Sequence, residues 1–419
     1  MLKNLWKKIG PGFITGAADD DPSGVATYSQ TGAIFGYSQL WLALFTFPFM
    51  IVIQQMCGRI GMVTGKGLAG VIHANYSKPV LYFAVSLLVI ANTINIGADL
   101  GAMAASAQML LGLPFLFWLL LMTGFIIVLE VFVTYKTYSK ILKYLALTLF
   151  AYVFTAFIVK LDWGIILINT VLPHIQFSKD YLLNIVAILG TTISPYLFFW
   201  QASQEVEEAI VDDKIPDIGV GTPAVSRKNV ADMNWDTIIG MFFSQAIMFF
   251  IIITTAATLH AKGITNIGTA SQAAEALRPV AGNLTYLLFA AGIIGTGLLA
   301  VPILAGSSAY AVAETAGLKA GLSKKPGRAP AFYGVIAVST LIGMSISLLG
   351  INPIKALYYA AALNGIAAPA LMVLVILIAN NKDIMGKFVN KRISNIAGWM
   401  IVLVMAIAAI LFIIDSLKG

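Results

Sequence analysis

The chain has 419 residues, of which 59% are hydrophobic and only 11% are charged, and its formal net charge is +7. Its mean hydropathy of +0.88 lies far outside the range of soluble globular domains, so the chain is an integral membrane protein. The single Cys57 excludes an intrachain disulfide. One cysteine with three histidines also excludes a structural zinc cage of the usual kind.

Long apolar stretches recur along the chain, and their length favours membrane-spanning helices over the strands of a β-barrel. The pattern predicts an all-α protein with eleven transmembrane helices in a single polytopic domain, residues 1–419. The spans are expected at residues 10–36, 39–62, 80–108, 114–134, 141–161, 182–206, 236–260, 284–314, 330–350, 354–380 and 396–415.

Basic residues are distributed unequally between the two sides of these spans. With a cytoplasmic N-terminus, only six of the 26 Lys and Arg residues fall on the outer side. They are Lys160, Lys179, Lys262, Arg278, Lys355 and Lys418. The positive-inside rule therefore predicts a multi-pass protein of the cell membrane with its C-terminus outside. The net positive charge is then a topology signal, so no nucleic-acid partner is expected.

The first span, Gly10 to Ala33, contains three consecutive aspartates, Asp19 to Asp21, followed directly by Pro22. A carboxylate at membrane depth is costly and indicates function. Pro22 lacks the amide that a continuous helix would use, and Gly24 tolerates unusual backbone angles. We therefore expect a discontinuous helix whose carbonyls and carboxylate face an internal cavity. Adjacent residues of a helix point about 100° apart, so at most one or two of the three acids line the site. We expect Asp21, which lies beside the break, to be one of them. The alternative is that Asp21 is only the N-cap of the second half of the helix.

The span at 182–206 has a second break, at Gly190 to Pro195. Each broken helix opens a set of five, which predicts two inverted repeats, residues 1–165 and 180–380, with an additional helix at 396–415. This expected arrangement resembles the leucine-transporter-type fold, with helices 1 and 6 broken. Paired breaks in the two halves indicate a transporter's binding site.

The side chains and carbonyls at the two breaks are hard oxygen donors, which suit Mg²⁺ and Ca²⁺ and, less exclusively, Mn²⁺. The expected metal-binding residues are Asp21, Ser23, Gly24, Thr191 and Ser194. Residues expected to surround or gate the ion are Ala18, Asp20, Asn95, Asp99, Tyr196 and Asn364. For Asp99 the alternative is a buried acid satisfied by neighbouring hydroxyls, and for the two asparagines it is a helix–helix hydrogen bond.

Other acids lie near the ends of spans. Glu130 and Glu314 are expected at the membrane interface. The three glutamates between Glu205 and Glu208 are expected at a solvated helix end, with an acidic mouth that concentrates cations as the alternative. The loop from Glu205 to Asp236 is either a hinge or lid, or merely a connection.

Gly10 to Ala33 resembles the first helix of the natural resistance-associated macrophage protein family, whose divalent metal transporters carry a Gly-Pro-Gly opening and an Asp-Pro-Gly-Asn metal motif. The match is ungapped. The shared residues are Gly10, Pro11, Gly12, Asp21, Pro22, Ala26, Thr27, Gln30, Gly32 and Ala33. The segment Ala305 to Ser308 in the eighth span also resembles that family. The resemblance implies a transporter of divalent metal ions.

The departures from the family pattern are informative. The metal motif reads Asp21 to Gly24, so its asparagine is lost, and the family's Met-Pro-His reads Ser194 to Tyr196. Losing the soft methionine sulfur removes the group that favours transition metals, and a wider oxygen-lined site fits partly hydrated Mg²⁺. The family's proton route is also depleted, because Ala102 stands three residues after Asp99 and the ninth span, 332–350, has no Arg. These features resemble the family's magnesium-transporting branch.

The leading hypothesis is therefore a carrier, not an enzyme, that moves Mg²⁺, with Mn²⁺ as a second substrate, through the bilayer by alternating access without a coupled proton. No cofactor is expected, and no nucleotide-binding motif indicates ATP. Three alternatives remain open: a proton-coupled Mn²⁺ or Fe²⁺ importer using Asp99, a sodium-coupled carrier of a small organic solute, and an intramembrane enzyme or receptor-like scaffold. The oligomeric state is left open.

Overall fold

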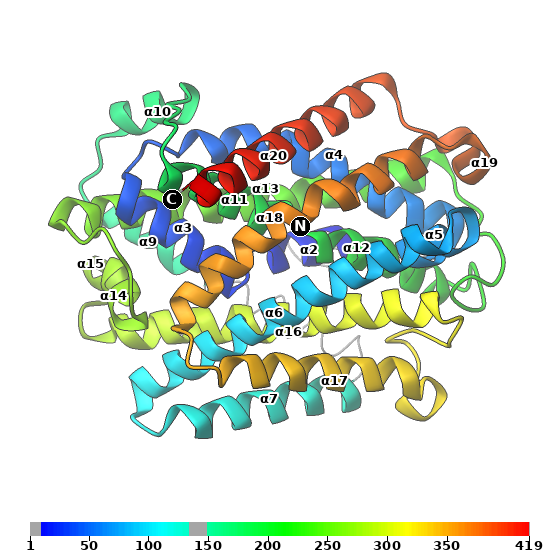
Figure 1. The fold of residues 1–419 in the computed structure, drawn as a ribbon, viewed down its shortest axis with the longest axis horizontal. Coiled ribbons are helices and arrows are strands. Elements are labelled where there is room, and N and C mark those ends of the chain that lie inside the picture. The colour runs from blue at the N-terminus through cyan, green and yellow to red at the C-terminus, as the bar shows by residue number, and fades with distance from the viewer. Residues whose placement is uncertain (1–9, 134–148, 419) are drawn as a thin grey trace, which may run out of the picture.

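The computed structural model describes residues 10–133 and 149–418, and their regular secondary structure is helical. Most of the long helices run lengthwise along the molecule (Figure 1). Nine segments of the described residues are long and apolar enough to cross a membrane. They are α4 (Trp41–Thr64), α6 (Lys78–Leu111), α7 (Phe115–Phe132), α11 with α12 (Lys179–Val211), α13 with a short 3₁₀ turn (Arg227–Lys262), α16 (Thr285–Thr315), α17 (Pro330–Ser347), α18 (Pro353–Asn380) and α20 (Arg392–Ile414).

The two other expected spans have a different form. The first consists of two short helices, α2 (Pro11–Asp19) and α3 (Pro22–Phe35), neither of which is long enough to cross alone. The fifth is described only in its second part, α9 (Phe150–Ile158), because residues 141–148 lie outside the described ranges. The membrane class is confirmed, whereas the count of eleven and the repeat boundaries stay predictions.

Shorter helices lie at the two ends of the bundle (Figure 1). At the end rich in Lys and Arg are α5 (Leu68–Asn75) and α19 (Lys382–Met385), and at the opposite end are α10 (Trp163–Val171), α14 (Ala270–Ala274) and α15 (Arg278–Ala281). The expected long loop is shorter than predicted. Because α12 continues to Val211 and α13 begins at Arg227, only residues 212–226 connect them.

Both breaks occur where the sequence predicts them. The second halves, α3 and α12 (Pro195–Val211), each begin with proline, which fits the first turn because its missing amide has no partner there. The residue before each proline has extended backbone: Asp21 has φ −64° and ψ 172°, and Ser194 has φ −79° and ψ 132°. The first halves of the broken helices end shortly before these extended residues: α2 ends at Asp19, and α11 (Lys179–Thr192) ends at Thr192.

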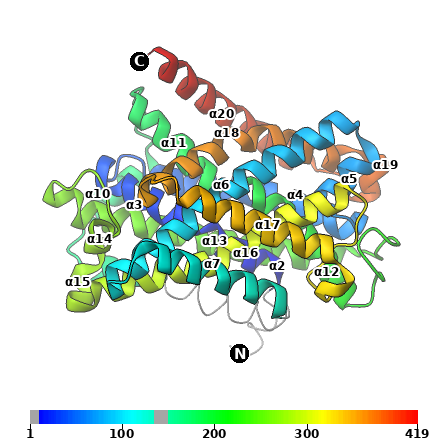
Figure 2. The same ribbon diagram turned by 60° about the horizontal axis from the view of Figure 1, so that its bottom comes forward.

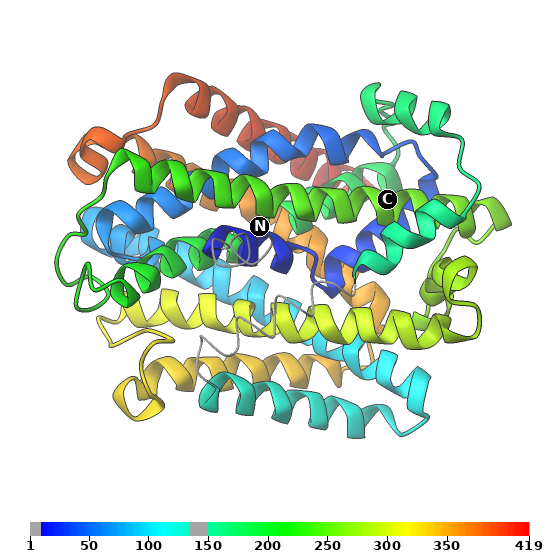
Figure 3. The ribbon, with the colours of Figure 1, turned by 180° about the vertical axis from the view of Figure 1, so that it is seen from behind.

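The broken helices form the interior of the bundle. Within the segment formed by α11 and α12, 94% of the residues in its apolar 18-residue stretch are buried. The corresponding share is 33% in α7, α17 and α20, so these three helices lie at the periphery. Figure 2 shows α7 and α17 side by side on the outside, and Figure 3 shows the long green α13 running along the dark blue α2. Asp21 and Ser194, at the two breaks, are 2% and 1% exposed, so the breaks lie deep inside the protein.

Candidate ion-binding site

The carboxylate of Asp21 is buried between the first break and α6. Its Oδ1 accepts hydrogen bonds from the amide of Gly24 and the hydroxyl of Ser23, both at 2.6 Å. Its Oδ2 accepts from Nδ2 of Asn95 at 3.0 Å. Asp21 therefore caps the N-terminus of α3, which agrees with the alternative interpretation of this residue as a helix cap. Only Oδ1 serves the cap, however, and Asp21 is 2% exposed at the centre of the bundle.

The two breaks approach each other at Ser23 and Thr191, whose hydroxyl oxygens are 3.4 Å apart. Gly24 permits this approach. A Cβ at that position would lie 3.2 Å from both the Asp19 carbonyl oxygen and the Thr191 hydroxyl oxygen. The expected ligands Asp21, Ser23, Gly24 and Thr191 thus lie together.

Two further residues of the second break make hydrogen bonds of their own. The Ser194 hydroxyl donates to the carbonyls of Gly190 at 2.7 Å and Thr191 at 2.8 Å, which leaves its lone pairs available to a cation. The Tyr196 hydroxyl donates to the Ala18 carbonyl at 2.7 Å and so joins α12 to α2. Tyr196 therefore holds the two breaks together.

The other two aspartates of the run diverge from Asp21. Asp19 accepts a 2.6 Å hydrogen bond from Ser244 on α13. Asp20 is fully buried, and neither of its carboxylate oxygens has a hydrogen-bond partner. Among the described residues, no three Asp, Glu, His or Cys side chains come together as a metal cage. An ion at the breaks must therefore be held partly by hydroxyls, carbonyls and its own waters.

Asp99 on α6 and Asn364 on α18 are buried without hydrogen-bond partners among the described residues. Asp99 is 0% exposed and Asn364 is 1% exposed, and none of their four side-chain polar atoms makes a hydrogen bond. The alternatives that hydroxyls satisfy Asp99 and that Asn364 joins two helices are therefore wrong. Asn95 does join two elements, through its bond to Asp21, but its Oδ1 has no partner.

A polar cluster closes the bundle on the side of α3 and α11. Asn184 donates to the hydroxyl of Thr31 at 2.9 Å and to the side-chain oxygen of Gln39, and it accepts from Tyr358 at 3.0 Å. Beyond it lies a cavity of about 400 Å³ whose lining includes Tyr358 and Asp180. Tyr358 therefore belongs both to this cluster and to the cavity lining.

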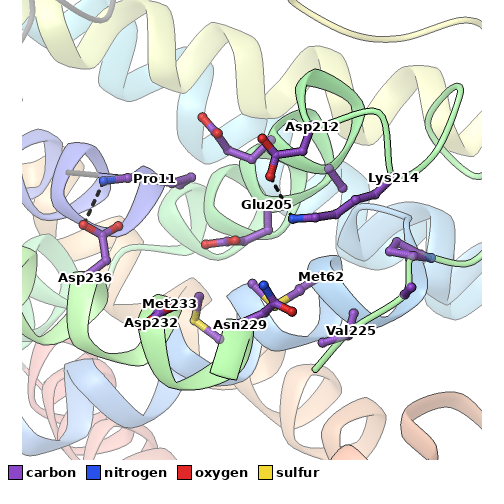
Figure 4. Close-up of a pocket in the computed structure, with 15 residues that line it drawn as sticks. Pro11, Met62, Glu205, Asp212, Lys214, Val225, Asn229, Asp232, Met233 and Asp236 are labelled. Atoms are coloured by element: carbon purple, nitrogen blue, oxygen red, sulfur yellow. Dashed lines mark hydrogen bonds and ion pairs between the residues drawn. The ribbon is translucent and has the colours of Figure 1, made fainter. Parts of the chain in front are cut away.

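A second set of contacts closes the opposite side. Thr15 on α2 donates to Gln201 on α12 at 2.5 Å, and Gln201 donates to Glu205 at 2.9 Å. Glu205 also lines a cavity of about 360 Å³, shown in Figure 4, together with Asp236 and other acids. The carboxylate of Asp236 accepts from the amides of Gly10 at 2.9 Å and Gly12 at 2.7 Å. It therefore caps α2 from another helix.

Several glutamates are more buried than predicted. Glu205 is 6% and Glu207 is 3% exposed, so the prediction of a solvated helix end is wrong for both. The cause is tertiary packing, because Glu207 accepts from the Tyr310 hydroxyl at 2.6 Å and the Leu322 amide at 2.8 Å. Glu130 is likewise buried, at 6% exposure, inside the end of α7. Glu314, at the end of α16, accepts hydrogen bonds from the amide of Gly67, just before α5, and from the amide of Gly70, within α5.

The sequence did not identify the residues that make long-range hydrogen bonds to the broken helices. Asn184, Gln201, Ser244 and Asp236 contact residues more than 140 positions away along the chain. For Asn184, Gln201 and Ser244, the available signal was a polar side chain within an apolar span. Asp236, at the edge of its span, offered none.

A polytopic membrane protein whose two broken helices meet around a buried carboxylate has the architecture of a secondary transporter. The family model described as Natural resistance-associated macrophage protein-like matches residues 12–415. The chain therefore belongs to the natural resistance-associated macrophage protein family, whose members are transporters and not enzymes.

Relatives match along nearly the whole chain. The divalent metal cation transporter MntH of Deinococcus radiodurans is 25% identical over 410 residues, covering 96% of this chain and 88% of its own. That of Klebsiella pneumoniae is 27% identical over 419 residues, covering 98% and 94%.

Two solved structures show the same fold. The Eremococcus coleocola manganese transporter superposes with a TM-score of 0.75 at 17% identity, covering 97% of this chain and 86% of its own. Mhp1, a nucleobase-cation-symport-1 family transporter, superposes with a TM-score of 0.64 at 13% identity, covering 98% and 90%. These likenesses confirm the predicted fold class.

Proposed function

We propose that this protein is a divalent metal cation transporter that takes up partly hydrated Mg²⁺, with Mn²⁺ as a second substrate, by alternating access without a coupled proton. The relatives from Deinococcus radiodurans and Klebsiella pneumoniae are both described as divalent metal cation transporters, which supports the substrate class. The finer choice of Mg²⁺ rests on the chemistry of the two breaks.

One observation carries that choice: the groups gathered at the breaks offer oxygen and no sulfur. The carboxylate of Asp21 and the hydroxyls of Ser23, Thr191 and Ser194 lie there, and residues 18–24 and 190–196 contain no Met, Cys or His. Hard oxygen donors suit Mg²⁺, which also keeps several of its waters. We propose Asp21, Ser23, Gly24, Thr191 and Ser194 as the residues that contact the ion or its waters.

The absence of proton coupling is supported by the environment of three positions. Asp99 has no partner that could pass a proton on, Ala102 offers no acid, and the Tyr196 hydroxyl is engaged by Ala18. The α17 helix, Pro330–Ser347, contains no basic residue. An inside-negative membrane potential would drive uptake, because each elementary charge gains about 2.3 kcal/mol per 100 mV.

We further propose that residues 1–165 and 180–380 form the two inverted repeats, that 396–415 is an added helix, and that the Lys- and Arg-rich end is cytoplasmic. The cavity lined by Glu205 and Asp236 would then open toward the cytoplasm, and that lined by Asp180 would open outside.

A second candidate is a proton-coupled Mn²⁺ carrier. The Eremococcus coleocola protein is described as a manganese transporter, and Asp99 is a buried acid near the site. The two candidates predict different selectivity and different proton movement.

The proposal is tested by Mg²⁺ uptake into proteoliposomes that contain a Mg²⁺ indicator. Wild-type protein and the Glu130→Gln variant, which changes a buried acid on α7, should both take up Mg²⁺. The Asp21→Ala variant should not, because it loses the carboxylate that offsets ion dehydration. Wild-type protein that admits Mn²⁺ but no Mg²⁺ would contradict the proposal.

A further inference from the structure

One face of α6 is polar in the middle of an otherwise apolar helix. Asn92, Asn95, Asp99 and Ser106 follow one another at spacings of three, four and seven residues, so they share that face. All four are at most 1% exposed. Each leaves at least one side-chain oxygen without a hydrogen-bond partner. The face therefore presents buried electron-rich oxygens that no donor in the described structure satisfies.

This face is fixed against the candidate site. Nδ2 of Asn95 donates to Oδ2 of Asp21 at 3.0 Å, which sets the rotation of α6. Asp99 lies one turn further along the same face, and its Cα–Cβ bond tilts back toward the N-terminus of α6, where Asn95 lies. Residues one turn apart have Cβ atoms about 5–6 Å from each other. Asp99 accordingly lies one helical turn from the residue that bonds Asp21.

Two carboxylates at this depth require positive charge. The ion pairs found in the described structure are Lys214–Asp212, Arg278–Glu275 and Lys324–Asp217, and none of them involves Asp21 or Asp99. A buried carboxylate is stable when it is paired or coordinates a cation. One carboxylate would leave a divalent ion with a net positive charge in a low-dielectric interior, whereas two neutralise it.

We propose that Asp99 is the second carboxylate that faces the transported ion, with Oδ1 of Asn95 as a neutral contact beside it. The inference rests on the proposed function and extends its binding site from the two breaks to α6. Asp99 lies one helical turn from Asn95, the residue that bonds Asp21, so we expect it to bind through the hydration shell that Mg²⁺ retains. Asp99 then adds a second negative charge beside that of Asp21, which favours divalent over monovalent ions.

Asp20 is the competing second carboxylate, since it too is buried without a hydrogen-bond partner. Its neighbour Asp19 is bonded to Ser244 and so faces α13, whereas Asn95 brings α6 to Asp21. The polar face of α6 therefore favours Asp99.

The test is Mn²⁺ binding by the full-length protein in nanodiscs, followed by the electron paramagnetic resonance of free Mn²⁺, with Mg²⁺ as competitor. Asp99→Asn should weaken Mn²⁺ binding and Mg²⁺ competition at least about tenfold, because the ion loses a facing charge. Glu130→Gln is the matched control, a buried acid of the same bundle with an unpartnered oxygen, and should bind within about twofold of wild type. Asp20→Asn is measured in parallel.

A second measurement does not depend on the folding of the Asp99 variant. Mg²⁺-induced infrared difference spectra of the wild-type protein should show two aspartates whose carboxylate bands shift on binding. Unchanged affinity in Asp99→Asn, a loss confined to Asp20→Asn, or a single shifted aspartate in the wild type would each overturn the inference. Wild-type protein that binds neither ion would instead overturn the proposed function.

Discussion

At the scale of single residues, the proposed selectivity rests on which atoms the two breaks present. Ser194 stands where the family's methionine stands, and its hydroxyl is oriented by the carbonyls of Gly190 and Thr191. A thioether at this position would add a soft ligand to a site otherwise built from hard oxygens. The residue identity could be read from the sequence, but the orientation of the hydroxyl could not, because it depends on how α11 ends.

Replacing Ser194 by methionine should move the preference for Mn²⁺ or Cd²⁺ over Mg²⁺ by about tenfold, since a soft ligand favours the softer ions. Competition of these ions for Mg²⁺ uptake measures the change. Ser194→Ala is the control, because it removes the hydroxyl without adding sulfur. If the preference for Mg²⁺ over Mn²⁺ in the uptake assay is the same in both variants, position 194 does not select the ion.

At the scale of elements, α2 depends on contacts from α13. Asp236 caps its N-terminus. A Cβ on Gly12 would lie 2.6 Å from the Thr237 amide nitrogen, and one on Gly16 would overlap the backbone of Gly240. The sequence predicted the break that ends α2, because proline and aspartate act locally. It could not predict the partner of α2, because Asp236 is more than 220 residues away and looks like any acid at a span end.

Replacing Asp236 by alanine should loosen α2. Loss of a helix cap costs about 0.5–2 kcal/mol, which corresponds to amide exchange in α2 that is roughly 2- to 30-fold faster. Hydrogen exchange of the peptide that covers residues 11–19 measures this effect. Asp232→Ala is the matched control, an exposed acid one turn earlier that lines the same cavity. Equal acceleration in the two variants would contradict a specific role of Asp236.

At the scale of the whole molecule, the fold was readable because apolar length and the two interruptions are strong signals. The spans matched nine helical segments, and both breaks lie where proline follows Asp21 and Ser194. The depth of the polar residues was less readable. Glu205 and Glu207 belong to a charged stretch that is typical of a solvated helix end. Both are nevertheless buried, because other helices enclose α12 as far as Glu207.

The proposed orientation gives a direct labelling prediction. Cys57 is fully buried and can be replaced to give a cysteine-free background. In intact cells, a membrane-impermeant maleimide should label Lys355→Cys and leave Lys228→Cys unlabelled, because both positions are exposed but the positive-inside rule places them on opposite sides. Permeabilised cells provide the control, in which both should react. Labelling of position 228 in intact cells would reverse the topology.

The central claim, uncoupled Mg²⁺ transport through the oxygen-lined breaks, is tested most directly by recording Mg²⁺ and pH indicators together in sealed proteoliposomes under an inside-negative potential. The account predicts Mg²⁺ entry without acidification of the lumen, lost in Asp21→Ala and kept in Glu130→Gln. Mn²⁺ entry accompanied by protons, with no entry of Mg²⁺, would contradict it and identify a proton-coupled transition-metal carrier instead.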